Sequence, residues 1–325
     1  MLKIKKEIYK QIIKIIKSYN NIVIARHIGP DPDAIASQIA LRDSIRRTYP
    51  NKNVYAVGAG VSKFKYLGDL DRVDVTQIEN ALLIVLDVPN FARVDGIEGL
   101  EYNAILKIDH HPAMDIIGDV DWTDDTKSST CEMLINLLLN TKLVIDTKIA
   151  EDLYVGLVFD NDRFLLSNTS SQTFEAVSTL LKTVPINFVA LYDNLYNRKM
   201  VELKFYAYLI DHIKITENGF GYLVIEDDIL QKYNVDASIP SHFINEFYFI
   251  EELISWCFIT HDDRMGIYKV NIRSRGPVIN EIAEKYNGGG HKFASGCRFS
   301  NKSDIDKLID DLDNACKAYN DSENC

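Results

Sequence analysis

The sequence predicts an α/β protein whose first part is a mostly parallel sheet flanked by helices, followed by a smaller C-terminal α/β domain. In the first half, short apolar β-branched runs alternate with helical patterns, which is typical of a parallel sheet. The length of 325 residues suggests two domains, at roughly 100 to 200 residues each. We expect domains at residues 1–185 and 211–325, joined by a helical linker over residues 186–210.

The elements of the first domain follow from periodicity and turn residues. Ile and Tyr recur at helical spacing near the N-terminus, which predicts an amphipathic first helix. Ser129 and Glu132 have the spacing of a capping box, which predicts the start of a helix that runs to residue 139. Apolar runs predict strands at residues 21–25, 54–57, 82–86 and 104–108, and helical patterns predict helices at 34–47, 129–139, 147–158 and 171–181.

The second half begins after Pro185, which marks the expected domain boundary. Residues 188–209 are rich in Tyr and Leu and are expected to form connecting helices. Beyond them the sequence predicts strands at 220–225, 254–259 and 267–272, and helices at 241–253 and 303–319.

Charge, hydropathy and cysteine content exclude several classes of protein. The formal net charge is 36 − 47 = −11, which argues against non-specific binding of long duplex nucleic acid but permits a local basic pocket. The apolar runs are far shorter than the roughly 20 residues that span a bilayer, so we expect no membrane partner. Five scattered cysteines without a C-x-x-C pair indicate neither disulfides nor a thiolate zinc site, and favour the cytoplasm.

Ionisable residues gather where the predicted strands end, which is where open α/β sheets bind their ligands. The first strand is followed by His27, Asp31 and Asp33, for which helix capping and metal binding are equally good interpretations. Asp87 follows the third strand and His110 the fourth. Asp160 ends an apolar helix and taken alone would be a solvated helix end.

Together these six positions supply four carboxylates and two imidazoles. Such oxygen-rich ligation suits Mn²⁺ or Mg²⁺, with Zn²⁺ or Co²⁺ as alternatives. The set is too large for one catalytic zinc ion and suits two divalent ions about 3.5 to 4 Å apart, with one bridging carboxylate. Phosphoester hydrolysis follows as the predicted chemistry.

The sequence resembles the DHH phosphoesterases. In the first half of the chain, the resemblance rests on four motifs in the same order as in the family: residues 27–37, Asp87 with Arg93, Asp109-His110-His111, and residues 156–169. Near the C-terminus, segments 271–275 and 288–296 are similar to the DHH-associated substrate domain. A stand-alone chain of this length is similar to the NrnA-like branch of bifunctional oligoribonucleases (nanoRNases) and pAp phosphatases.

The resemblance implies a role for each matching residue. One Mn²⁺ would be held by His27, Asp31 and Asp87, and the other by Asp33, Asp87, His110 and Asp160. Asp109 would lie next to the metal ligands without binding an ion itself, and His111 would face the scissile phosphate. The residues expected to bind substrate are Arg93, Arg273, Arg275, Gly288, Gly289, Gly290 and His291; without the upstream motifs the last four would be a glycine-rich turn.

The resemblance implies a Mn²⁺-dependent phosphoesterase that hydrolyses short single-stranded RNA or dinucleotides to mononucleotides and dephosphorylates pAp to AMP. A phosphodiesterase for cyclic di-AMP or pApA and a non-catalytic nucleotide-binding module are the alternatives, and a homodimer is left open. The chain departs from the family at Pro32 and Ala36, at Asn287, over residues 88–90, and at Phe159, Asn161 and Asp162. These changes are expected to alter substrate preference and metal tuning.

Overall fold

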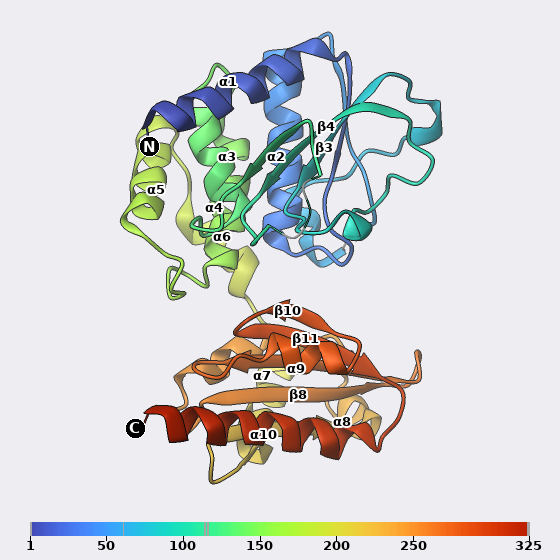
Figure 1. Ribbon diagram of the computed structural model, residues 1–325, viewed down its shortest axis with the longest axis vertical. Helices are drawn as coiled ribbons and strands as arrows, with labels where there is room; N and C mark the ends of the chain where they lie inside the picture. Colours follow the sequence, from blue (N-terminus) through green and yellow to red (C-terminus); the bar gives the residue numbers. More distant parts are fainter. Residues whose placement is uncertain (1, 61, 114, 116, 324–325) are drawn as a thin grey trace. The chain divides into compact units, whose positions relative to one another are not determined.

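The first half of the chain forms a sheet of five parallel strands, in the order β2-β1-β3-β4-β5 (Figure 1). The computed structural model describes residues 2–60, 62–113, 115 and 117–323, and the chain divides into two compact units, Met1–Asn197 and Arg198–Cys325. The strands of the first unit are β1 (Asn21–Ala25), β2 (Asn53–Ala56), β3 (Ala81–Leu86), β4 (Tyr102–Asp109) and β5 (Val120–Thr123). The predicted α/β class is therefore confirmed.

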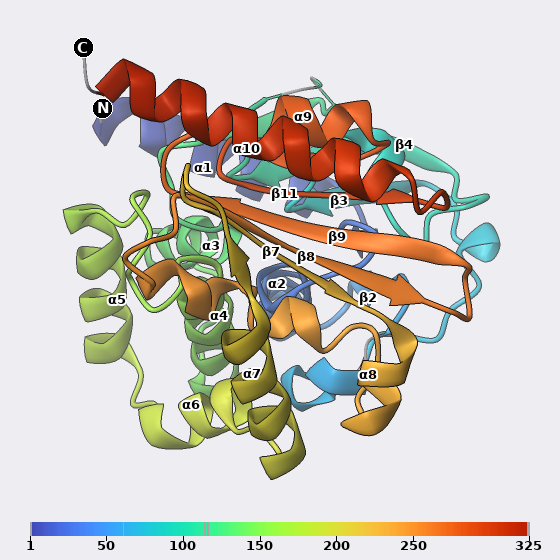
Figure 2. The same ribbon diagram turned by 90° about the horizontal axis from the view of Figure 1, so that it is seen from below.

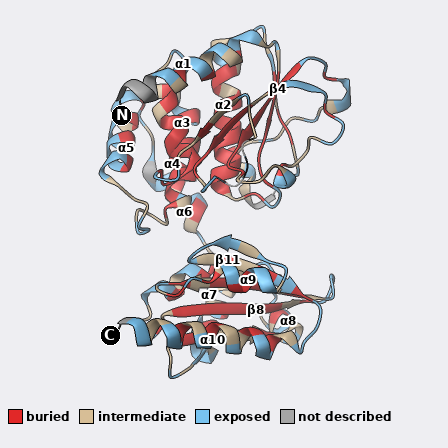
Figure 3. Ribbon diagram, in the orientation of Figure 1, coloured by how far each residue is buried: buried red, intermediate tan, exposed pale blue. Residues whose placement is uncertain are grey.

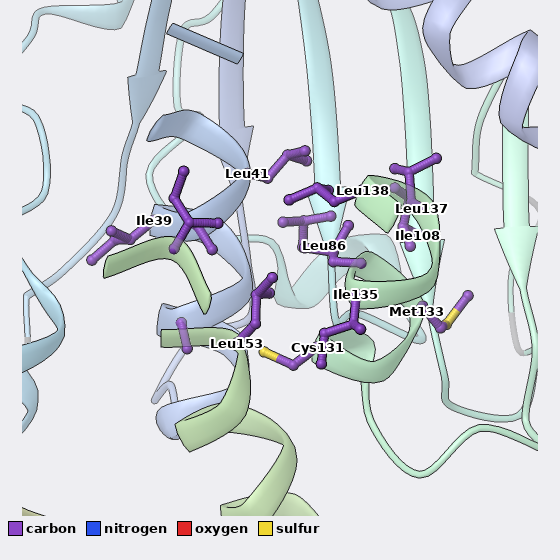
Figure 4. Packing of buried hydrophobic residues seen from close by; sticks show 14 of the residues in the cluster. Ile39, Leu41, Leu86, Ile108, Cys131, Met133, Ile135, Leu137, Leu138 and Leu153 are labelled. Atoms are coloured by element: carbon purple, nitrogen blue, oxygen red, sulfur yellow. The ribbon is translucent and has the colours of Figure 1, made fainter. Parts of the chain in front are cut away.

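In the part of the first unit that the structure describes, six α-helices accompany this sheet, and 3-10 helices lie at Ser62–Leu67, Val75–Gln77 and Phe91–Arg93. The α-helices are α1 (Leu2–Ser18), α2 (Pro32–Thr48), α3 (Thr130–Leu139), α4 (Thr147–Asp160), α5 (Ser171–Thr183) and α6 (Phe188–Tyr196). Alternate strand residues such as Leu86 and Ile108 point into the core that α2, α3 and α4 share (Figure 4). The remaining positions, such as Val85, join a smaller cluster on the other face. Because both faces are covered, the whole of β3 is buried (Figure 3).

Helices α2 and α4 pack closely because α4 carries Gly156 at the contact. A Cβ atom at this position would lie 2.4 Å from Cys131 Sγ and 3.1 Å from the Cα of Asp33. No side chain larger than hydrogen fits there without displacing the start of α2. The small residue thus fixes the distance between α4 and the segment that carries Asp33.

The second unit contains a six-stranded mixed sheet in the order β10-β11-β9-β8-β7-β6, in which only β7 and β8 pair in parallel. Helices α9 and α10 cover one face, and α7 and α8 lie on the other (Figure 2). The elements are α7 (Met200–His212), β6 (Lys214–Ile215), β7 (Phe220–Ile225), α8 (Asp227–Lys232), β8 (Ser255–Asp262), β9 (Ile267–Ser274), α9 (Asn280–Lys285), β10 (Gly289–His291), β11 (Ala294–Phe299) and α10 (Asp304–Glu323).

The predicted helix over residues 241–253 is wrong. Two 3-10 helices, Pro240–His242 and Ile244–Phe249, occupy most of this segment. The carbonyl groups of Tyr248, Ile250 and Glu251 accept hydrogen bonds from the Arg275 guanidinium at 3.0 to 3.2 Å. These carbonyls are directed at a tertiary partner, so the local helical pattern does not continue.

The other predicted strands and helices are confirmed, with ends that differ by a few residues. The short elements β5, α8, α9 and β11 were not predicted, and the glycine-rich segment pairs as β10 with β11. The predicted limits of the domains and of the linker stay a prediction. Among the described residues, no helix combines the length and the apolar character needed to cross a membrane.

Replacing Gly156 with Ala is expected to destabilise the metal-free chain by about 1 to 3 kcal/mol, because the added methyl group overpacks the contact between α2, α3 and α4. The measurement is urea unfolding followed by circular dichroism. Gly60 is the matched control, since a Cβ atom there would have no neighbour within 4 Å. Equal unfolding free energies for Gly156→Ala and Gly60→Ala would contradict this account of the packing.

Candidate metal centre

The carboxyl ends of β1, β3 and β4 bring together the ionisable residues that follow them. In the order β2-β1-β3-β4-β5, the chain reverses its direction of winding between β1 and β3, and such a switch point leaves a crevice at the sheet edge. His27 follows β1, Asp87 follows β3 and His110 follows β4. Asp160 is the last residue of α4. Segments far apart in sequence therefore meet at one edge.

Asp87 lies between two groups of candidate ligands. Its Oδ2 atom is 3.5 Å from Nε2 of His27, and its Oδ1 atom is 3.4 Å from Nε2 of His110. Asp31 completes the group around His27, with Oδ2 3.9 Å from the same Nε2 atom. Asp160 Oδ2 lies 3.3 Å from His110 Nε2. One carboxylate thus presents a different oxygen to each side.

All six predicted metal ligands occur in these groups. Within each group, the available ligand atoms lie within 4.8 Å of one another, which is close enough for a common ion. The groups are His27, Asp31 and Asp87; Asp33, His110 and Asp160; and Asp87, His110 and His111. Nitrogen and carboxylate donors in this proportion suit divalent cations such as Mn²⁺ or Mg²⁺, with Zn²⁺ and Co²⁺ also compatible. The residues present therefore fit a centre for two divalent ions.

The backbone at Asp87 adopts a conformation that L-residues rarely use. Its φ is 60°, in the left-handed region, directly after the buried strand β3. The amide N–H of Asp87 donates to the Ile108 carbonyl at 3.1 Å, and the Thr130 hydroxyl donates to Asp87 Oδ1 at 3.1 Å. Strained backbone of this kind persists only where surrounding contacts over-determine it, and it concentrates at functional sites.

Asp33 is held by the N-terminus of α3. The backbone N–H groups of Thr130 and Cys131 donate to its two carboxylate oxygens at 2.9 and 3.0 Å. These are N–H groups without a partner inside the helix, and the helix dipole favours an anion there. The interpretation of Asp33 as the cap of α2 is therefore wrong, because the cap is Asp31, which accepts from the Ala34 N–H at 3.0 Å. The role of Asp33 in metal binding stays a prediction.

The predicted capping box at the start of α3 is half right. Ser129 accepts from the N–H of Glu132, as predicted. The Glu132 carboxylate does not return to Ser129 but accepts from Ser128 and pairs with Lys127 at 2.8 Å. A buried lysine provides a stronger partner for this carboxylate than a backbone N–H group.

The metal-free site is electrostatically crowded. Burial and the neighbouring Asp87 raise the pKa of Asp33 to about 7, and burial raises the pKa of Asp160 well above its usual range. Burial opposes ionisation of Asp87 too, but hydrogen bonds from His110 and His27 outweigh it and hold the pKa of Asp87 well below its usual value. Divalent cations would relieve the repulsion among these carboxylates.

The two imidazoles compensate part of this negative charge. Burial lowers the pKa of His27, but Asp87 and Asp31 outweigh that effect and raise the pKa to about 9. Burial likewise opposes protonation of His110, yet Asp160 and Asp87 raise its pKa well above the usual value. Both rings are therefore protonated at neutral pH when no metal is bound.

Asp109 and His111 are paired beside these groups. Asp109 is fully buried at the end of β4, and its Oδ1 atom lies 2.8 Å from His111 Nδ1 and accepts from the His111 N–H at 3.2 Å. Asp109 is absent from the candidate ligand groups of the described residues. His111 joins the group of Asp87 and His110. The predicted roles of Asp109 and His111 stay predictions.

The predicted substrate-binding residues lie in both units. In the first unit, Arg93 is exposed and its carbonyl accepts from Ile28, directly after His27, at 2.8 Å. In the second unit, Arg273 donates to Asn245 at 2.8 Å. The Arg275 guanidinium holds the carbonyls of the 248–253 loop, so its donors have structural partners.

The glycine-rich segment joins the end of α9 to β11. A Cβ atom on Gly288 would lie 2.2 Å from the Gly296 carbonyl oxygen, and Gly290 has a φ of 138°. Gly289 faces open space, and His291 pairs with Ala294. Close strand packing accounts for two of these glycines, and their predicted role in substrate binding stays a prediction, as do the roles of the two arginines and His291.

Three residues that support the site were not singled out from the sequence. Thr130 binds Asp87, as described above. Arg26 is fully buried and donates to the His27 carbonyl and to Asp95. Lys107 is fully buried next to Asp109, with Nζ 3.3 Å from Oδ2. The signal for the last two was a cation within or directly after an apolar strand, since Lys and Arg are almost never fully buried unless paired.

Both units match known protein families. Residues 21–157 match the DHH family, N-terminal domain, and residues 221–318 match the DHHA1 domain. The chain is similar to the bifunctional oligoribonuclease and PAP phosphatase NrnA of Bacillus subtilis (strain 168), with 36% identity over 95% of this chain and 99% of the relative. It is also similar to the probable NrnA of Streptococcus mutans, with 34% identity over 95% and 99% of the two chains.

Among solved structures, an exopolyphosphatase-related protein from Bacteroides fragilis has the same fold. Its crystal structure matches with a TM-score of 0.84 and 20% identity over 96% of this chain and 98% of that one. Coverage of nearly the full length by similar proteins agrees with the two domain matches. The chain therefore belongs to the DHH family of phosphoesterases, with a DHH domain followed by a DHHA1 domain, and it is a hydrolase.

Proposed function

We propose that this hydrolase cleaves short oligoribonucleotides to mononucleotides and dephosphorylates pAp to AMP, with two Mn²⁺ ions as cofactors. The observation that carries the proposal is the position of Asp87, whose two oxygens face different imidazoles. The similarity to oligoribonuclease and PAP phosphatase relatives from Bacillus and Streptococcus supports these substrates. The oxygen-rich donor set supports Mn²⁺.

In this proposal the ligands divide between two ions. His27, Asp31 and Asp87 would hold one, and Asp33, Asp87, His110 and Asp160 the other. When bound, such ions activate water and neutralise charge that develops on the phosphoryl oxygens.

The protein side chains orient the substrate and the ligands. His111 has Nδ1 2.8 Å from Asp109 Oδ1, and in this proposal its other ring nitrogen would meet the scissile phosphate. Thr130 and the N-terminus of α3 hold Asp87 and Asp33 in position.

The substrates and the compartment remain parts of the proposal. Short single-stranded RNA, dinucleotides and pAp are the expected partners, in preference to long duplexes, because the chain is acidic overall. The described cysteines are all free and buried, which is compatible with the proposed cytoplasmic location.

Incubation of the purified chain with pApA, pAp and cyclic di-AMP in separate reactions tests the substrate assignment. With Mn²⁺ present, we expect pApA to yield AMP and pAp to yield AMP and phosphate, because both present a phosphoester of a small nucleotide. Chromatographic separation of the products gives the measurement. Turnover of cyclic di-AMP alone would reject the assignment.

Asp87→Ala is expected to lower kcat on pApA at least about 10³-fold, because the variant lacks the ligand that both ions would share. Without bound ions, the charge that develops on the phosphoryl oxygens in the transition state is not neutralised. Steady-state kinetics with Mn²⁺ provide the measurement. Asp125→Ala removes an exposed carboxylate from the same unit and should retain the activity of the unaltered chain. Full activity in Asp87→Ala would exclude the two-ion arrangement.

Metal binding at pH 7 is expected to release protons. A metal ligand must be a neutral imidazole, whereas the pKa of His27 is about 9 and that of His110 is raised well above its usual value. The apparent affinity for Mn²⁺ should therefore rise as the pH increases from 6 toward 9. Calorimetry in two buffers of different ionisation enthalpy counts the protons released.

His27→Gln should release about one proton fewer than the unaltered chain, because the raised pKa of His27 leaves one proton on that ring at pH 7. The control His212→Gln changes a histidine in the other unit and should leave the count unchanged. Binding heats that do not depend on the buffer would contradict the protonated state of the two rings.

A further inference from the structure

Lys107 is a cation in the interior of the parallel sheet. It lies on β4 and pairs in register with Val85 on one side and Asp121 on the other. Its side chain is fully buried. An ammonium group taken out of water at such a position is costly unless a counter-charge compensates it. Within the described part of the chain, Asp109 is the one carboxylate within 4.0 Å of Lys107 Nζ, at 3.3 Å.

Asp109 divides its two oxygens between Lys107 and His111. The Oδ2 atom is buried and makes no hydrogen bond of acceptable geometry, so its attraction to the ammonium group is an ion pair. The Oδ1 atom lies 2.8 Å from Nδ1 of His111 and accepts from the His111 N–H at 3.2 Å. The Asp109 carboxylate therefore connects the Lys107 ammonium group inside the sheet with the imidazole ring of His111.

Stability alone is a poor explanation for this lysine. Its neighbours on the same face of the sheet include Val85 and Ile105, and besides the ion pair with Asp109 its Nζ atom donates a long hydrogen bond, 3.5 Å, to the Asp115 carbonyl. Replacing a buried ion pair by packed hydrophobic residues is often neutral or stabilising. The charged pair is more easily understood if the orientation of the Asp109 carboxylate matters to the site.

We propose that Lys107 is a positioning residue that acts through Asp109 on His111. The ammonium group anchors Oδ2, which turns Oδ1 toward the ring and fixes the tautomer of His111 with its proton on Nδ1. The nitrogen that meets the substrate is then always Nε2. This inference rests on the proposed function in one respect, that His111 meets the scissile phosphate.

Lys107→Met tests the proposal, since methionine keeps the length and removes the charge. We expect kcat on pApA to fall about tenfold while KM stays within about twofold, because the variant misorients a ring without removing a substrate contact. Arg42→Met is the matched control. Arg42 is also a buried cation of the first unit, and it pairs with Asp43 at 2.7 Å and with Asp71 at 3.3 Å, which belong to none of the candidate ligand groups. Its kcat should stay within about twofold of the unaltered chain.

A spectroscopic measurement separates positioning from a loss of stability. In the metal-free, ¹⁵N-labelled full chain, the ring nitrogens of the seven histidines can be resolved, and His111→Gln identifies the signal of His111. The unaltered chain and Arg42→Met should show His111 protonated on Nδ1. Lys107→Met should show that preference lost. If Lys107→Met does not fold, Lys107→Gln, which retains a hydrogen-bond donor, replaces it and should show a weakened preference.

A Lys107 variant that folds and keeps both the original kcat and a His111 proton on Nδ1 would overturn the proposal. An equal loss of kcat in Arg42→Met would also overturn it, because the effect would then belong to any buried pair. If the unaltered chain cleaves none of the nucleotides, the proposed function fails, while the ring signals still decide whether Lys107 positions His111.

Discussion

The site depends on the ionised carboxylate of Asp87 being held between two imidazoles at the edge of a parallel sheet. Its neighbours Asp31, Asp33 and Asp160 all have raised pKa values, since burial and mutual repulsion oppose their charge. Asp87 alone among the four has a lowered pKa, because His27 and His110 both donate to it. The other candidate ligands are arranged around this one fixed charge.

Holding so much buried charge in place requires a scaffold that provides hydrogen bonds without adding flexibility. Helix α3 does this with its first N–H groups, which bind Asp33, and with the Thr130 hydroxyl, which binds Asp87. Gly156 allows α4 to approach closely enough for Asp160 to reach His110. The core shared by α2, α3 and α4 is thus part of the site as well as of the fold.

Much of this could be predicted from local pattern. The strands of the parallel sheet could be predicted because apolar β-branched runs form strands in most contexts. Five of the candidate ligands follow those runs, and the sixth, Asp160, ends an apolar helix. The predicted helix over residues 241–253 is wrong, because Arg275 donates to the Ile250 and Glu251 carbonyls, and a local sequence pattern contains no information about this distant partner. The backbone after Asp160 was not predicted either, since Asp162, Arg163 and Phe164 all have positive φ, which L-residues rarely adopt.

The sequence by itself determined the fold class, the order of the elements and the identity of the candidate ligands, because periodicity and residue type at strand ends are local properties. Only the tertiary structure decided which oxygen of Asp87 faces which ring, which side chain caps α2, and that Thr130 and Lys107 support the site. The contacts of Asp33 and Asp87 with the start of α3 join segments up to about a hundred residues apart, and even the local choice of Asp31 as the cap leaves Asp33 for that distant helix. They depend on strand order and helix packing, which no local pattern contains.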